Sequence, residues 1–264
     1  MYHPYLYMIK IKILLALNYR YEVLFSLISK LLLLCASVFF WKAAYHNLNT
    51  VSAVNENQMI VYSVFSIILS SLFSMSVEGN IRSRVRKGNI AVDYIKPIEI
   101  FKMYFCEDLG NSVTAFLQTV IPVLAVSALF IVKPLPASPL NFLLFLISAC
   151  FSYGILWLMS AMFGLLYFWF IDIGPLGSIK DYIILILSGS FIPVWLYPQQ
   201  IQSVLKFLPF IYTYQHPLSI YIGKISLTQA LYGMLIQVIW IFAFLLLFSF
   251  LKNKVEKNIL VQGG

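Results

Sequence analysis

Ionisable side chains gather in one stretch of this sequence, residues 78–108. It holds six basic and five acidic residues, which are Arg82, Arg84, Arg86, Lys87, Lys96, Lys102, Glu78, Asp93, Glu99, Glu107 and Asp108. The apolar segments 59–77 and 109–132 flank it, and each is long enough to cross a membrane. A charged connection between two such segments is expected to lie in water at a membrane face. Its cations could pair with acidic residues of a partner protein, or serve only as topological and lipid-facing charge.

Glu107 and Asp108 are a candidate carboxylate pair for a membrane-embedded enzyme that acts on lipids. The alternative, which we favour, is that both acids cap the start of a helix beginning at residue 109, where negative charge stabilises the helix dipole. No G-x-x-x-x-G-K-[ST], H-E-x-x-H, C-x-x-C or G-x-S-x-G motif occurs. We therefore expect no catalytic residues, no metal and no cofactor in this chain.

The composition indicates a membrane protein. Hydrophobic residues make up 61% of the chain and charged residues 11%, whereas soluble domains average about 25% charged residues. Apolar stretches of membrane-spanning length recur, which predicts an all-α fold with six transmembrane helices in a single domain, residues 1–264. The expected spans are 23–41, 59–77, 109–132, 140–170, 182–196 and 230–251.

The placement of the positive charges predicts the topology. With six crossings and both termini in the cytoplasm, fourteen of the 18 Lys and Arg residues fall inside. The four outside are Lys42, Lys133, Lys206 and Lys224. This asymmetry follows the positive-inside rule, so we attribute the net charge of +8 to topology and to membrane lipids rather than to nucleic acid.

The N-terminal part of the chain raises two local questions. Residues 1–20 have a blurred amphipathic pattern, which we interpret as an interfacial helix; a frayed extension of the first span is the alternative. Lys30 lies about 10 Å inside the first span at 1.5 Å per residue. Such a lysine most often extends to the nearer headgroups, and a functional charge inside the membrane is the alternative.

Small residues mark two helices. Ser66, Ser70 and Ser74 recur every four residues, so they line one helical face. That face could serve close helix packing or form a polar wall of a translocation path, and the two roles are compatible at a dimer seam. Ser160 and Gly164 form a small-xxx-small pair, which predicts a closely packed neighbouring helix.

The segment before the last span is divided by glycine and proline. Its breaking residues are Gly189, Pro193, Pro198, Pro209 and Pro217. The apolar pieces between them are too short for a plain crossing and return. We interpret them as one crossing followed by an extracytoplasmic re-entrant hairpin over residues 197–217.

Two stretches resemble the ABC-2 class of ABC-transporter permeases. The first is the Gly–apolar–Lys-Pro pattern within 78–108, carried by Arg84, Gly88, Ile90, Asp93, Lys96 and Pro97. The second is the run L-S-G-S-F-I-P at 187–193 followed by Y-P, L-P-F and H-P at 197–217. With the six expected spans and the interfacial helix, the resemblance covers nearly the whole chain.

This resemblance implies a transport subunit rather than an enzyme, in a bacterial cytoplasmic membrane. It implies a dimer, with a second copy or a related permease, that binds two copies of a cytoplasmic ABC ATPase carrying ATP and Mg²⁺. Loop 78–108 would then hold a coupling helix near residues 90–95, stopped by Pro97. Spans two and five would line the path of an exported amphipathic, lipidic or peptide-like substrate, with Gly189 and Pro193 among its residues, and the hairpin would cap it.

The residues implied in ATPase coupling are Arg82, Arg84, Arg86, Lys87, Gly88, Ile90, Asp93, Lys96 and Pro97. An ATP-independent lipid scramblase or secondary carrier is the alternative from another functional class. The chain has no phosphate-binding loop of its own and no buried acid–base pair within a predicted span, which favours the ATP-driven system.

Overall fold

A computed structural model describes residues 7–11, 14, 20–46, 50–51, 53–88, 99–170 and 176–262. The expected interfacial helix 1–20 lies largely outside these residues. The expected coupling helix lies entirely outside them, together with Ile90, Asp93, Lys96 and Pro97. Both helices therefore stay predictions.

The described chain is almost wholly helical. Its helices are α2 (Arg20–Tyr45), α3 (Glu56–Leu72), α4 (Val77–Arg86), α6 (Ile100–Ala115), the π-helix η1 (Phe116–Val120), α7 (Ile121–Phe130), α8 (Pro139–Leu166), α9 (Leu176–Leu187), the 3₁₀ helix η2 (Val194–Leu196), α10 (Gln199–Leu205), the 3₁₀ helix η3 (Phe210–Tyr212), α11 (Gln215–Tyr221) and α12 (Leu227–Gln262). Two short antiparallel strands, β1 (Thr50–Val51) and β2 (Val54–Asn55), join α2 to α3.

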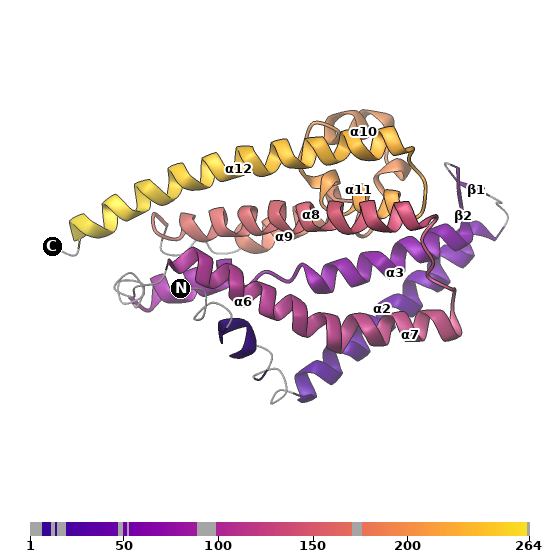
Figure 1. Cartoon of the computed structure of the whole chain (residues 1–264), viewed down its shortest axis with the longest axis horizontal. Coiled ribbons are helices and arrows are strands. Elements are labelled where there is room, and N and C mark those ends of the chain that lie inside the picture. Colours follow the sequence, from indigo (N-terminus) through magenta and orange to yellow (C-terminus); the bar gives the residue numbers. More distant parts are fainter. Residues whose placement is uncertain are drawn as a thin grey trace.

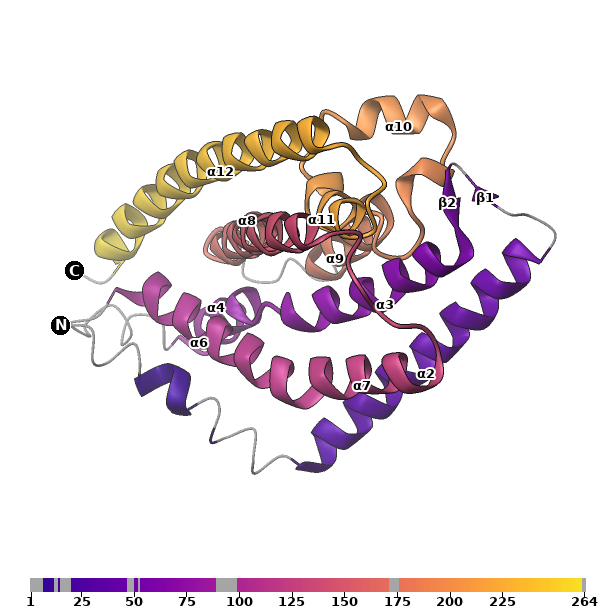
Figure 2. The same cartoon turned by 45° about the vertical axis from the view of Figure 1, so that its right-hand side comes forward.

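Among the described residues, five helical stretches are long and apolar enough to cross a membrane. They are Tyr21–Tyr45, Glu56–Arg86, Ile100–Phe130, Pro139–Leu166 and Leu227–Glu256. The predicted all-α membrane fold is therefore confirmed. The long helices run side by side between two ends, and Figure 1 shows α10 and the strands at one end and the C-terminal part of α12 at the other. Figure 2 places α4 at that second end, so we call the two ends the α10 end and the α4 end.

Local sequence signals set several helix boundaries. Asn55 and Gln58 form a capping box at the start of α3, in which each side chain accepts a hydrogen bond from the other residue's backbone N–H. Ser138 caps α8 by accepting from the Asn141 backbone N–H, and Pro139 follows at the first position of the helix. These caps fix where the chain re-enters the bundle at the α10 end.

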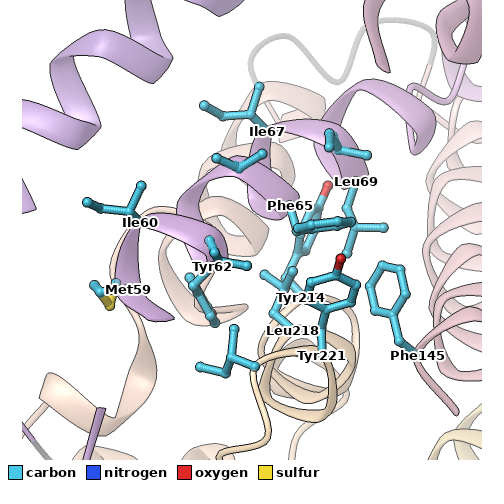
Figure 3. Close-up of a cluster of buried hydrophobic side chains, with 14 of the residues drawn as sticks. Met59, Ile60, Tyr62, Phe65, Ile67, Leu69, Phe145, Tyr214, Leu218 and Tyr221 are labelled. Carbon is cyan, nitrogen blue, oxygen red and sulfur yellow. The ribbon is translucent and has the colours of Figure 1, made fainter. Parts of the chain in front are cut away.

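The main hydrophobic core lies between α3, α8 and α11 (Figure 3). Phe65 of α3 packs its ring 3.8 Å from that of Tyr221 and 5.6 Å from that of Phe145, measured between centroids. In the most apolar window of the stretch Glu56–Arg86, 67% of residues are buried, against 11% in α2 and in α12. Span two is therefore the centre of the bundle, and α2 and α12 expose their apolar side chains at its periphery.

The structure places several helix boundaries at residues other than those predicted. Residues 78–108, expected as a loop, are helical at both ends, because α4 extends to Arg86 and α6 begins at Ile100 rather than at residue 109. The expected fifth span 182–196 is not one helix. α9 ends at Leu187 and is about 18 Å long at 1.5 Å per residue, which is shorter than a bilayer core of about 30 Å.

Candidate functional site

A polar cavity of about 480 Å³ opens at the α4 end, between the α3–α4 segment, α8 and α9. We call it the ion-pair cavity. Its polar lining includes Ser70, Ser74, Glu78, Arg82, Ser160 and Lys180. These side chains come from two of the membrane-length segments and from α9, so the tertiary fold alone brings them together.

Glu78 and Lys180 form a buried ion pair at this cavity. The Lys180 side chain is 5% exposed, and its Nζ donates to Glu78 Oε2 and, at 3.3 Å, to Ser160 Oγ. The Asp181 carboxylate lies 3.2 Å from the same Nζ. Tyr167 Oη donates to the other Glu78 oxygen over 3.5 Å. A buried charge is tolerated when it is paired and hydrogen-bonded, as here, so this pair joins α4, α8 and α9 at one point.

Two glycines allow this close approach. A Cβ on Gly177 would lie 2.3 Å from Glu78 Oε1, and one on Gly164 would lie 2.7 Å from Ile81 Cδ1. The small-xxx-small pair of Ser160 and Gly164 therefore packs against a neighbouring helix, as predicted, and that helix is α4.

The sequence did not single out Lys180 as a functional residue. It was counted only as a topological charge, since it stands beside Asp181 at the start of an apolar run. One available signal was Gly177, three residues before Lys180, because a residue without a Cβ permits a close contact of its helix with another segment. The identity of the partner, 102 residues away, was not available from any local pattern.

Span two is broken where it reaches the ion-pair cavity. α3 ends at Leu72 and α4 begins at Val77, so the residues between are not helical. Asp108 of α6 accepts the hydrogen bonds of donors at this break. Its fully buried carboxylate accepts from the Ser76 backbone N–H at 2.7 Å, from Ser76 Oγ at 2.5 Å and from Trp157 Nε1 at 3.1 Å.

α6 also pairs with a backbone carbonyl on the α3 side of the break. Ser112 Oγ donates to the Leu72 carbonyl at 2.7 Å. Asp108 therefore caps α4 of span two, and the expectation that it caps the start of span three was wrong, because α6 begins eight residues before it. A carboxylate with no exposed surface that accepts from these three donors, and from Asn111 Nδ2 at 3.5 Å, is a structural cap, which argues against the lipid-enzyme hypothesis.

The three predicted serines divide into two environments. Ser66 Oγ donates to the Ser190 carbonyl at 2.5 Å, beside an apolar cavity of about 500 Å³ between α2, α3 and residues 190–192. Ser70 and Ser74 line the ion-pair cavity instead. Ser74 lies in the break, so the expected continuous helical face ends at Ser70.

Ser70 and Ser74 also line a second polar cavity, of about 440 Å³, between α2, α3 and the α6–η1 segment. Lys30 lies in its wall, and we call it the Lys30 cavity. The broken part of span two thus separates two polar cavities.

The basic residues predicted to contact an ATPase lie on α4 and just after it. The Arg82 guanidinium lies 5.6 Å from the centroid of the Tyr167 ring and borders the ion-pair cavity. Arg84 is half-buried, whereas Arg86 and Lys87 are exposed. Gly88 has a φ of +70°, a conformation that favours glycine, and it ends the helical segment.

The broken segment after α9 turns sharply at Gly189, which has a φ of +79°. Its carbonyl accepts from Tyr62 Oη at 2.6 Å, and a Cβ there would lie 2.4 Å from Gln215 Oε1. Pro193 precedes η2, so the predicted interruption occurs at these two residues. The position therefore requires glycine for both conformation and space.

The following hairpin runs into the bundle and returns. The Tyr212 carbonyl accepts from Ser152 Oγ at 3.0 Å and from Gln237 Nε2 at 2.7 Å. Ser152 lies about 20 Å along α8 from its first residue at 1.5 Å per residue. The Tyr221 carbonyl is back at the α10 end, where it accepts from the Ala137 backbone N–H at 3.0 Å.

The three prolines of the hairpin lie at or near the starts of its short helices. Pro198 and Pro209 directly precede α10 and η3. Pro217 is buried near the start of α11. All three positions suit a residue that lacks a backbone N–H, because the first turn of a helix leaves that group unpaired.

Comparison with known families agrees with this architecture. The family model described as "ABC-2 family transporter protein" matches residues 31–257. A search of curated proteins finds no match. The matched range includes the broken second span, the ion-pair cavity and the hairpin. This chain is a multi-pass membrane protein and belongs to the ABC-2 family of transporter proteins.

Proposed function

We propose that this chain is the membrane subunit of an exporter driven by ATP that a separate ABC ATPase hydrolyses. Family membership supports a transport subunit. The sequence holds no phosphate-binding loop, which supports a separate ATPase. The observation that carries the proposal is the pair α4 and α6, which lead from two adjacent spans to the short connection 89–98.

In this proposal α4, the connection and α6 move as one coupling unit. Asp108 ties the start of α4 to α6 through the Ser76 backbone and side chain. A push on the connection by a closing ATPase would therefore displace both helices together, with the non-helical residues before Val77 as the bend. Arg86 and Lys87 are exposed beside this connection and suit an acidic partner surface.

We further propose six crossings, with both termini and the connection 89–98 in the cytoplasm. The fifth crossing would consist of α9, the turn at Gly189 and the chain up to residue 196, and the hairpin over residues 197–217 would follow it. The hairpin would be re-entrant from the outer side, as the depth of Tyr212 supports. The subunit would act as a dimer, with itself or a related permease, on two ATPase copies.

The cavities suit an amphipathic substrate. Ser190 borders both the polar ion-pair cavity and the apolar cavity beside Phe191, so the two spaces meet at one residue. A molecule with a polar head and an apolar body could occupy both. Span two and α9 would form its path, with Ser70 and Ser74 on the wall.

The test replaces residues 90–95 with a Gly/Ser linker and measures co-purification of the partner ABC ATPase when it is co-expressed with this chain. We expect that co-purification is lost while membrane insertion is unchanged. The matched control replaces exposed residues Lys206 and Phe207, at the α10 end, with Gly and Ser. The control should retain the ATPase.

Two outcomes would overturn the proposal. One is co-purification of the ATPase at the wild-type level after the linker replacement. The other is transport by this chain alone in proteoliposomes, with no effect of ATP analogues. The second outcome would favour an ATP-independent scramblase or carrier.

A further inference from the structure

Lys30 is a charged side chain inside a membrane-length helix, and no described residue pairs with it. It lies about 15 Å along α2 from Arg20 at 1.5 Å per residue and is half-buried in the wall of the Lys30 cavity. No described residue forms a hydrogen bond or ion pair with its ammonium. Charges inside a bilayer are costly, and they commonly mark functional sites.

Glu22 does not neutralise Lys30. Glu22, Ser26 and Lys30 follow at four-residue spacing, so they lie along one face of α2 and along the cavity. The rise of the helix separates Glu22 from Lys30 by about 12 Å, which is beyond an ion pair. The cavity therefore continues from Lys30 along α2 towards the residues at which the helix begins.

The opposite wall is built by an irregular helix. Pro122 lacks the N–H that would pair with the Gln118 carbonyl in an α-helix. The chain forms a π-helix there instead, in which the Ile121 N–H donates to the Phe116 carbonyl. This segment places Gln118 and Thr119 in the cavity wall, and no described residue accepts or donates a hydrogen bond at either side chain. Single π-turns are frequent at functional sites.

The surroundings of the cavity are apolar and exposed. Phe25 of α2 is 67% exposed, and Phe116 and Leu117 of η1 are also exposed. A polar cavity whose one lysine has no partner among the described residues, close in sequence to exposed apolar residues of two membrane-length helices, matches a molecule with an anionic head and hydrocarbon chains. The ammonium and the amide and hydroxyl donors suit the oxygen atoms of a phosphate.

We propose that the Lys30 cavity binds the phosphate group of a phospholipid, with Lys30 on the phosphate oxygens and Gln118 beside it. The acyl chains lie against the exposed apolar surface of α2 and η1. The bound molecule is either a resident lipid of the bilayer or a phosphate-bearing amphipath in transit, since both offer the same group. The site is distinct from the ion-pair cavity, where Lys180 already has its partners.

The test uses the isolated full-length chain, so its outcome does not depend on ATPase coupling. Wild type, Lys30→Gln and Lys42→Gln are reconstituted in nanodiscs of phosphatidylglycerol and phosphatidylethanolamine, extracted, and weighed by native mass spectrometry. Lys42 is an exposed lysine of the same helix and serves as the matched control. We expect phospholipid retention about tenfold weaker in Lys30→Gln, since a charge-assisted contact is lost. Lys42→Gln should match wild type, and Lys30→Arg should restore binding.

A second arm distinguishes the two sources. In proteoliposomes that also contain the ATPase, ATP should release the bound lipid if it is in transit and leave it in place if it is resident; both results agree with the site. Equal lipid retention in Lys30→Gln and Lys42→Gln would overturn the proposal. So would loss of dimers in Lys30→Gln with unchanged lipid, because Lys30 would then contact a second copy of the chain.

Discussion

Lys180 and Lys30 both bring an ammonium group to a polar cavity beside the broken second span, and the protein treats them differently. Lys180 is 5% exposed and is met by Glu78, Ser160 and Asp181. Lys30 is half-buried, and no described residue pairs with it. The cation of the ion-pair cavity is thus compensated within the chain, whereas the cation of the Lys30 cavity has no partner among the described residues.

This difference separates a lysine whose contacts stabilise the fold from a lysine that is available for binding. Removing one partner of a buried pair leaves the other charge without that partner, so breaking such a pair destabilises the fold. Removing an unpaired charge orphans nothing. Four substitutions test this contrast, and they are ordered by the size of the effect that we expect.

Glu78→Ala should have the largest effect. It leaves the Lys180 ammonium buried without its main partner, which costs about 3–5 kcal/mol of folding free energy. Thermal unfolding in detergent should show a clear loss of stability. The double variant with Lys180→Met should recover most of it, because no buried charge then remains. A double variant as unstable as Glu78→Ala would contradict the importance of the pair.

Asp108→Ala should have the next largest effect on stability. It removes the acceptor of the Ser76 N–H and of the Trp157 indole N–H, and each orphaned donor costs about 1–3 kcal/mol. Asp108→Asn keeps one acceptor oxygen and should be milder. Hydrogen exchange should localise the new mobility to the segment between α3 and α4. Unchanged protection there would show that the break does not depend on this cap.

Lys30→Met should leave stability within about 1 kcal/mol of wild type, or raise it, because the substitution orphans no partner. The same unfolding assay measures it beside Glu78→Ala. A loss as large as that of Glu78→Ala would show that Lys30 has a partner within the protein. The comparison between the two lysines would then fail.

Glu99→Gln should have the smallest effect, and it provides an exposed counterpart to the buried pair. A hydrogen bond from Lys102, and then Lys252, lowers the pKa of Glu99 below its ordinary value. The stabilisation is therefore present above that ordinary value and is lost as the pH falls through the lowered one. Because Glu99 is 42% exposed, we expect these contacts to contribute about 0.2–1 kcal/mol to the free energy of unfolding. As the pH falls, wild type should therefore lose slightly more stability than the variant. Identical acid profiles would show that the contact adds nothing.

The sequence was informative wherever a rule acts over a few residues. Apolar run lengths predicted the five long segments that the structure contains. Gly189 and Pro193 predicted the interruption after α9, because glycine permits a positive φ and proline fixes φ and lacks a backbone N–H. The pair Ser160 and Gly164 predicted a close helix neighbour. Helix ends beside the charged stretch were misplaced, since α4 and α6 continue beyond the apolar pattern.

By itself, then, the sequence determined a helical membrane protein with cations concentrated at one connection, because hydrophobicity, charge and proline act locally. Only the tertiary structure decided that Lys180 meets Glu78, that Asp108 caps a helix other than its own, and that Lys30 faces a cavity without a described partner. These outcomes depend on contacts between residues 32 to 102 positions apart, or on the lack of one. Which helix faces come to share a cavity is set by packing, and no local pattern encodes it.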